Sequence, residues 1–211
     1  MINDERKKEV IEKLKERYTK NSYNRAELTD EEAEKQYQEQ VRSMLIPTPS
    51  RYRDVKAEDI PKNVLASIPL PQGKNGYYIW GDVGTGKTHT LYAMRVHFAE
   101  RLTRLKIVNM SELFASIKKS FSEKESLDFL EEASYYNGFD DVGTEKDTEW
   151  AGEQMYRLVN NLYENKKHFV FTSNHSLKEL AGRFGEQGDR IASRIAEMCE
   201  VIEIKGKDRR I

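Results

Sequence analysis

The chain has 211 residues, and its 35 Lys and Arg nearly balance its 36 Asp and Glu, giving a net charge of −1. This length predicts one domain with an appendage, and the balanced charge excludes a global basic field that would attract nucleic acid. The one cysteine excludes an internal disulfide and a cysteine zinc site. No apolar run approaches the ~18 residues of a membrane span, and no secretory signal opens the chain. We therefore expect a soluble, cytoplasmic protein without membrane contact.

The first 46 residues predict a helical arm. A narrow apolar stripe lies on a charged helix at Val10, Ile11, Leu14 and Tyr18. A second helix is predicted to begin at Thr29, because Thr29 and Glu32 fit a capping box. Its stripe consists of Ala33, Tyr37, Val41, Met44 and Leu45. Stripes this thin cannot form a core alone, so the arm must pack on its own domain or on a partner, and both alternatives remain open.

A linker is predicted at 47–50, where Pro47-Thr48-Pro49-Ser50 breaks the helix. Strands and helices then alternate from 51 to 211. The predicted strands are Tyr77–Trp80, Leu105–Met110, Tyr135–Asp141, His168–Ser173 and Glu200–Lys205. The predicted helices are 88–101, 111–120 with Ser111 as its cap, 123–133, 148–167, 177–184 and 189–199. Such alternation is typical of a parallel sheet covered by helices.

A phosphate-binding loop follows the first predicted strand. Gly81–Thr88 reads Gly-Asp-Val-Gly-Thr-Gly-Lys-Thr, which matches the full G-x-x-x-x-G-K-[ST] pattern between a strand and a helix. Glycines let the backbone curl so that its amides converge on a phosphate, and the helix N-terminus adds a positive dipole. Lys87 is expected to reach the β- and γ-phosphates, and Thr88 to place its hydroxyl on Mg²⁺. The predicted nucleotide-binding residues are Gly81, Asp82, Val83, Gly84, Thr85, Gly86, Lys87, Thr88 and His89.

The ends of the third and fourth predicted strands supply the rest of the site. Asp140 is expected to hold Mg²⁺ through water, and Asp141 to orient or deprotonate the attacking water. A glutamate is more usual than Asp141 in ATPases with this arrangement, and the shorter side chain predicts slow hydrolysis. Asn174 follows the fourth strand, so in a parallel sheet it lies beside the phosphates and can donate to the γ-phosphate or the water.

Two arginines occur on one face of the last predicted helix. Arg190 and Arg194 are four residues apart, so both project from the same side of that helix. Either can enter the nucleotide site of a neighbouring subunit, because the guanidinium stays charged and binds phosphate through two hydrogen bonds.

Together these motifs resemble the DnaC/DnaI-type helicase loaders, a branch of the AAA+ ATPases close to the IstB transposition ATPases. The resemblance extends over roughly 49–210. It implies a three-layer α/β/α domain with a five-stranded parallel sheet, no full helical lid, and a preceding helical arm. Gly81–Thr88 is similar to the Walker A motif, Asp140–Gly143 to Walker B, Thr172–Asn174 to sensor 1 and Asp189–Arg194 to the box with the arginine finger. Arg194 is the first choice for the finger, Arg190 the second, and Arg210 a candidate for the sensor 2 role.

The resemblance also implies a function. ATP-bound subunits would associate through the arginine finger into an oligomer that holds single-stranded DNA, and the arm would bind a hexameric replicative helicase. The implied activity is slow ATP hydrolysis with Mg²⁺, stimulated by DNA or the partner. Lys118 and Lys119 are candidates for the DNA contact.

Three other functions remain open from the sequence. An IstB-like helper ATPase would deliver duplex DNA to a transposase, and the near-neutral charge disfavours it. A small P-loop kinase would need an acceptor pocket and an arginine-bearing lid. A non-hydrolysing adaptor would use ATP only to drive assembly, and the aspartate at 141 keeps this alternative open.

Overall fold

The computed structural model describes residues 4–21, 28–119, 136–144 and 149–208, and these contain a five-stranded sheet in the order β2-β3-β4-β1-β5. Every strand pair is parallel. The strands are β1 (Gly76–Trp80), β2 (Leu105–Asn109), β3 (Tyr136–Val142), β4 (Phe169–Ser173) and β5 (Cys199–Glu203). The structure therefore confirms all five predicted strands, with ends that differ by one or two residues.

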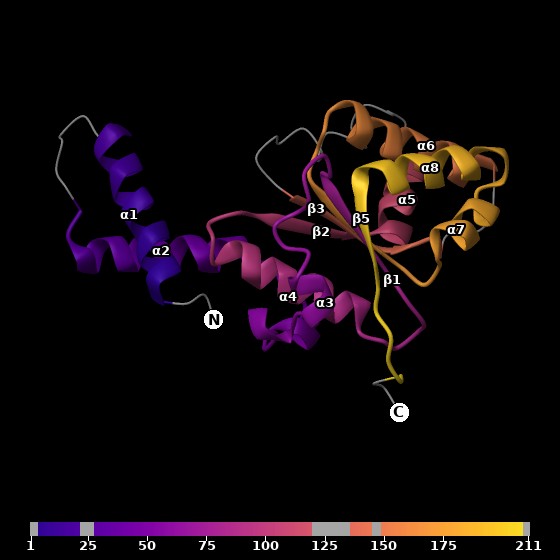
Figure 1. Cartoon of the computed structure of the whole chain (residues 1–211). Helices are drawn as coiled ribbons and strands as arrows, with labels where there is room; N and C mark the ends of the chain where they lie inside the picture. The colour runs from indigo at the N-terminus through magenta and orange to yellow at the C-terminus, as the bar shows by residue number, and fades with distance from the viewer. Residues whose placement is uncertain (1–3, 22–27, 120–135, 145–148, 209–211) are drawn as a thin grey trace.

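Helices cover both faces of this sheet, as Figure 1 shows. One face carries α3 (Lys62–Leu65) and α4 (Lys87–Ala99). The other carries α5 (Met110–Lys119), α6 (Glu149–Glu164), α7 (Leu177–Arg183) and α8 (Gly188–Met198). Short 3₁₀ turns lie at Ser50–Tyr52, Ala57–Asp59 and Gly185–Gln187. The chain thus has the predicted three-layer α/β/α architecture, and the described residues after β5, 204–208, form no helix.

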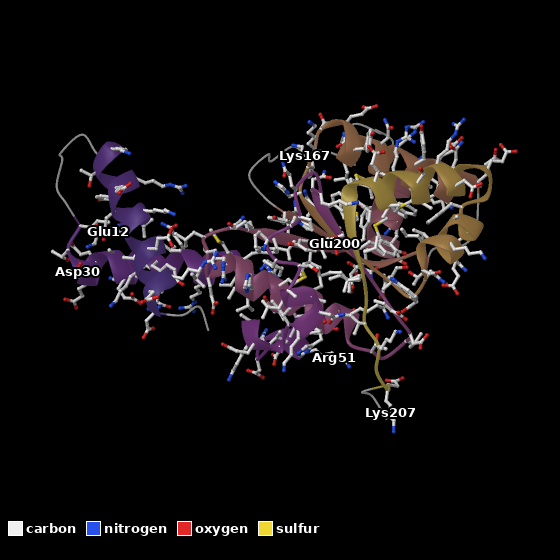
Figure 2. All side chains as sticks on the ribbon, viewed as in Figure 1. Glu12, Asp30, Arg51, Lys167, Glu200 and Lys207 are labelled. Carbon is white, nitrogen blue, oxygen red and sulfur yellow. The ribbon has the colours of Figure 1, made fainter. Side chains whose placement is uncertain are left out.

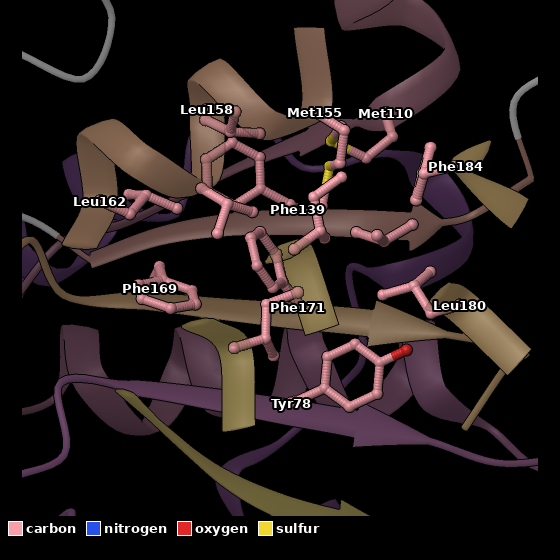
Figure 3. Packing of buried hydrophobic residues seen from close by; sticks show 14 of the residues in the cluster. Tyr78, Met110, Phe139, Met155, Leu158, Leu162, Phe169, Phe171, Leu180 and Phe184 are labelled. Carbon is pink, nitrogen blue, oxygen red and sulfur yellow. The ribbon is translucent and has the colours of Figure 1, made fainter. Parts of the chain in front are cut away.

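Side chains of each strand alternate between two apolar cores, because successive residues of a strand point to opposite faces. Tyr77 and Ile79 of β1 pack with α4, whereas Tyr78 faces the cluster under α6 and α8. Figure 3 shows this second cluster, in which Phe139 and Phe171 lie with ring centroids 5.2 Å apart. These aromatic contacts hold β1, β3 and β4 together below the ends where polar residues gather.

One local expectation required revision. Ser111 does not cap α5: the side-chain oxygen of Asn109 accepts the backbone N–H groups of Ser111 at 3.0 Å and Glu112 at 3.4 Å, so the helix begins earlier. Gly138 of β3 fits a tight packing site, because a Cβ there would lie 3.1 Å from Ile107 and 3.2 Å from Leu91. The helix predicted at 123–133 lies outside the described residues. Within the described ranges, no helix combines the length and apolar content needed to span a bilayer.

The arm consists of α1 (Asp4–Asn21) and α2 (Asp30–Met44), which project from one end of the sheet (Figure 1). The predicted capping box is present, with Glu32 N–H donating to Thr29 Oγ1 at 3.3 Å and Thr29 N–H to the Glu32 carboxylate at 2.9 Å. The arm's stripes meet each other and bury Leu14, Ala33 and Tyr37. Charged side chains such as Glu12 and Asp30 lie away from the sheet (Figure 2).

The arm is fastened to α4. The Tyr37 hydroxyl donates to the carbonyl of Glu100 at 3.0 Å, just past the end of that helix. Arg95 of α4 is 7% exposed, and its guanidinium donates to the carbonyls of Met44 and Pro47, each at 2.9 Å. The predicted linker is therefore held by a buried cation, and the arm packs on its own domain while α1 keeps a free outer surface.

Replacing Arg95 tests this attachment. Arg95→Met keeps much of the side-chain volume but removes the buried donor of the hydrogen bonds to the Met44 and Pro47 carbonyls, which costs about 1–3 kcal/mol. We expect faster proteolytic cleavage within 44–50 and a lower Tm. Arg53→Met, at an exposed position beside the same junction, should change stability by less than ~0.5 kcal/mol. Equal resistance of the two variants to protease would show that Arg95 does not hold the arm.

Candidate nucleotide site

A cavity of about 430 Å³ opens at the carboxyl ends of β1, β3 and β4. It brings together residues of several predicted motifs, from Val83 to Asn174, which are 91 positions apart. The cavity is lined by Arg51, Tyr52, Val83, Gly84, Gly86, Lys87, Thr88, His89, Asp141, Thr144 and Asn174. Its position matches the rule that open α/β sheets bind ligands at the carboxyl edge of their strands. The roles of these residues remain predictions, but their convergence is a property of the fold.

The phosphate loop needs glycine at two positions in particular. Gly86 has φ 96° and forms the left-handed N-cap of α4, a conformation that side chains disfavour. Gly84 has φ 81°, and a Cβ there would collide with the carboxylate of Asp208. The tail after β5 is thus close against the loop, where Ile204 N–H donates to the Trp80 carbonyl at 2.7 Å. Thr85, also in the loop, is buried, and its hydroxyl donates to the Asp82 carbonyl at 2.8 Å.

Lys87 is folded into the loop that precedes it. Lys87 is only 5% exposed, and its ammonium donates to the carbonyls of Gly81 and Asp82, each at 2.8 Å. Ionised acceptors form stronger hydrogen bonds with an ammonium than neutral carbonyls do. A phosphate in the cavity therefore offers Lys87 a better partner than either carbonyl.

Asp140 is the buried centre of the polar cluster. Its Oδ1 accepts hydrogen bonds from Thr172 Oγ1 and, at 3.1 Å, from Thr88 Oγ1. Burial raises the pKa of Asp140 above its ordinary value, and the nearby Asp141 raises it further, while the hydroxyl of Thr172 opposes the shift. The carboxylate therefore ties β3 to β4 and to the start of α4, at an electrostatic cost in the absence of a cation.

The oxygens of Thr88 and Asp140 fit a magnesium ion. A hydroxyl and a carboxylate 3.1 Å apart are hard oxygen ligands, and Mg²⁺ binds proteins through one or two such groups together with phosphates and water. A cation would also offset the cost of burying Asp140. These two residues are the ones that would hold the ion, which would supply charge neutralisation for the phosphates.

Asp141 reaches the cavity through an irregular turn of the strand. The pairing of β3 with β4 shifts register between Phe139 and Val142, and Asp141 has φ 61°. Its backbone N–H donates to Thr172 Oγ1 at 3.1 Å. Asp and Asn tolerate the left-handed region better than other side chains because they can bond to nearby backbone. This conformation gives a physical reason for the aspartate where a longer glutamate was considered more usual.

Several functional candidates were missed from the sequence or lie elsewhere. Thr172 was assigned only to the sensor 1 stretch, yet its hydroxyl donates to the Asp140 carboxylate and accepts the backbone N–H of Asp141. The available signal was a hydroxyl side chain near the end of a predicted strand. Arg51 and Tyr52 also line the cavity, although they lie outside the motifs predicted from the sequence (Figure 2 labels Arg51). Tyr52 stacks on Tyr92 with centroids 4.2 Å apart. Asn174 lines the cavity as expected from its place after β4.

Four further candidates, Arg190, Arg194, Lys118 and Lys119, are not among the residues that line this cavity. Arg190 and Arg194 lie on α8. Arg210 falls outside the described residues. Lys118 and Lys119 are exposed on α5, with the Lys118 ammonium 5.6 Å from the centre of the Trp150 ring. The structure therefore separates the phosphate-binding residues from the predicted finger and DNA contacts.

The raised pKa of Asp140 predicts a stability difference that depends on pH. Above the folded-state pKa the native protein buries a charge, and this cost disappears as pH falls through that pKa towards the unfolded value. Asp140→Asn should therefore raise Tm at pH 7 relative to wild type without magnesium, and the two values should converge near pH 4. Magnesium with nucleotide should reverse the order at pH 7 by stabilising the wild type alone. A Tm difference between the two proteins that stays constant with pH would contradict the raised pKa of Asp140.

Comparison with known proteins places this site in a family. The bacterial DnaA ATPase domain family matches residues 59–199. The replicative helicase loader DnaI of Bacillus subtilis (strain 168) is 28% identical over 148 residues, which are 64% of this chain and 47% of that protein. A crystal structure of DnaI has a TM-score of 0.62 at 26% identity and covers 77% of this chain and 94% of that one.

A structure of the replication initiator DnaA bound to AMPPCP and single-stranded DNA shares the fold, with a TM-score of 0.56 at 20% identity over 75% of this chain and 51% of that one. This chain spans less than half of the length of the curated DnaI and DnaA proteins that it matches. The family match covers β1, β2, β3 and β4 with all their carboxyl-edge residues. The chain therefore belongs to the bacterial DnaA ATPase domain family, and within the AAA+ proteins it is of the DnaC/DnaI type.

Proposed function

We propose that this protein is an ATP-dependent loader of a replicative DNA helicase onto single-stranded DNA, acting as an ATP-assembled oligomer. The observation that carries the proposal is the convergence of Lys87, Thr88 and the Asp140–Asp141 pair around one cavity. This is the arrangement that phosphoryl transfer needs, because such chemistry depends on positioning and charge stabilisation. The similarity to DnaI supports the helicase as client.

The residues of the cavity have separate tasks in hydrolysis. Lys87 and the amides of the loop bind the β- and γ-phosphates, and Thr88 with Asp140 would hold the magnesium ion. Asp141 accepts a hydrogen bond from the attacking water and then its proton, as the water oxygen bonds to the γ-phosphorus. The bond to the bridging oxygen breaks, and ADP leaves. Asn174, at the tip after β4, donates to the γ-phosphate or orients the water.

A second subunit completes the site in this proposal. Neither arginine of α8 lines the cavity of its own subunit, so the finger acts in a neighbouring copy. Its guanidinium would stabilise charge on the γ-phosphate only when ATP is bound. ATP therefore joins subunits, and hydrolysis releases them.

The arm provides the proposed helicase contact. A groove of about 750 Å³ runs beside the arm's junction with α4, where Ile46 is 62% exposed. Exposed apolar groups next to a groove are typical of protein interfaces. For DNA, the candidate contacts are Lys118 and Lys119, and Lys118 lies over the Trp150 ring, a pairing of cation and aromatic ring that single-strand binding surfaces use. The DnaA structure with single-stranded DNA supports this assignment by its fold alone.

Removing the Asp141 carboxylate tests the chemistry. Asp141→Asn keeps a side chain that tolerates the left-handed backbone but removes the proton acceptor. Turnover should fall about a hundredfold or more, as expected for a lost general base. Affinity for a fluorescent ATP analogue should stay close to wild type. If turnover survives while binding is unchanged, another group activates the water.

The functional proposal is tested by measuring ATP hydrolysis with and without single-stranded DNA and a candidate hexameric helicase, together with unwinding by that helicase from a DNA circle. We expect both ligands to stimulate turnover and the protein to permit unwinding. Arg194→Ala should lower stimulated turnover about a thousandfold while leaving nucleotide binding intact. If stimulated turnover is lost in Arg190→Ala and not in Arg194→Ala, Arg190 is the finger. Phosphate transfer to a nucleoside, or assembly by ATP without turnover, would favour the kinase or adaptor alternatives.

A further inference from the structure

Arg194 lies across the faces of two tyrosines on the neighbouring helix. Its guanidinium carbon is 4.9 Å from the ring centre of Tyr156 and 5.7 Å from that of Tyr163. The two rings are seven residues apart on α6, which places them on one side of that helix. The contact thus joins α8 to α6 on the face that carries both candidate fingers.

The Tyr163 ring is itself fixed to α8 by a hydrogen bond. The Tyr163 hydroxyl donates to Glu197 Oε1 at 2.8 Å, and Glu197 lies one helical turn after Arg194. Tyr163 therefore touches α8 twice, through its ring face and through its hydroxyl. A hollow of about 400 Å³ lies beside this contact and is lined by Tyr163, Asp189, Arg190, Ser193, Arg194 and Glu197.

Stacking orients a guanidinium without using its hydrogen bonds. A salt bridge would engage the N–H groups, whereas an aromatic face attracts the flat side of the cation and leaves the edge available. Arginine otherwise loses much rotamer freedom when it binds a phosphate, and a preformed orientation reduces that loss.

We propose that Tyr156 and Tyr163 are positioning residues that hold the Arg194 guanidinium edge-outward, ready to bind the γ-phosphate of ATP in an adjoining copy of this chain. This inference rests on the proposed function, because it requires a finger that acts between subunits. It adds two aromatic side chains of α6 to the hydrolysis machinery, on the subunit that does not bind the hydrolysed ATP.

A mixing experiment tests the inference with the full-length chain. Subunits with Asp141→Asn have a silent site but an intact finger, and subunits with Arg194→Ala have an intact site but no finger. Each protein alone should hydrolyse little ATP, and their mixture should regain turnover at mixed interfaces. No recovery in the mixture would overturn the trans-acting finger and with it the proposed function.

The tyrosine changes are then placed on one partner at a time. Tyr156→Leu with Tyr163→Leu in the Asp141→Asn subunit, which donates the finger, should lower the recovered turnover about tenfold. The same pair in the Arg194→Ala subunit should leave it unchanged, although any folding damage is identical. Equal losses on both sides, or no loss on the donor side, would overturn the inference while the proposed function stands.

A conservative pair separates ring from hydroxyl. Tyr156→Phe with Tyr163→Phe in the finger-donating subunit keeps both aromatic faces and should retain turnover within about threefold. A loss as large as that of the leucine pair would show that the faces do not position Arg194. The ATP concentration for half-maximal turnover should stay the same when the tyrosine changes are in the finger-donating subunit, since the subunit that hydrolyses ATP is then unaltered.

Discussion

The hydrogen bonds from Thr88 and Thr172 to Asp140 connect the three elements on which the whole site depends. They join the first turn of α4 to the ends of β3 and β4, so the phosphate loop cannot shift without disturbing both strands. A buried carboxylate is a costly way to make that connection, because burial raises the pKa of Asp140. The cost has a functional reason if the carboxylate is held ready for a cation. The fold thus keeps a destabilising carboxylate at the position where a magnesium ion would stabilise it.

The helix α4 has a second role beyond presenting Lys87 and Thr88. Its later turns carry Arg95, and the carbonyl of Glu100 lies just past its end; both hold the arm. The helix rises about 1.5 Å per residue, so Arg95 lies about 10 Å along it from Thr88 and Glu100 about 18 Å. In the proposed function each subunit carries its own arm fixed to α4, so bound nucleotide would act on a partner at the arm through the arrangement of neighbouring subunits.

The sequence predicted those features whose cause is local. The apolar run Tyr77-Tyr78-Ile79-Trp80 indicated a buried strand, and the glycine spacing indicated a loop that needs a tightly curled backbone. Features that depend on contacts between distant segments were not predictable. Nothing in the sequence near Arg95 distinguishes it from other arginines on helices, and its role comes from two carbonyls near the linker that accept its hydrogen bonds. The bulge that turns Asp141 into the cavity arises from the register between β3 and β4, which no residue pattern in either strand specifies. Thr172 acquires its role only because the order of strands places β4 beside β3.

The charge around the cavity bears on the proposed second subunit. Its lining contains two cationic side chains, Lys87 and Arg51, opposed by the carboxylate of Asp141, with Asp140 buried just behind. Phosphoryl transfer spreads negative charge over the γ-phosphate oxygens, and the proposed function adds an arginine of a neighbouring copy to the magnesium ion, Lys87 and Arg51 that would offset this charge. Helix α8 carries two arginines that line a separate hollow and not this cavity. Of these, Arg194 is restrained by aromatic rings whereas Arg190 is exposed, and restraint is what a group needs if it is to enter another molecule's site with little loss of entropy.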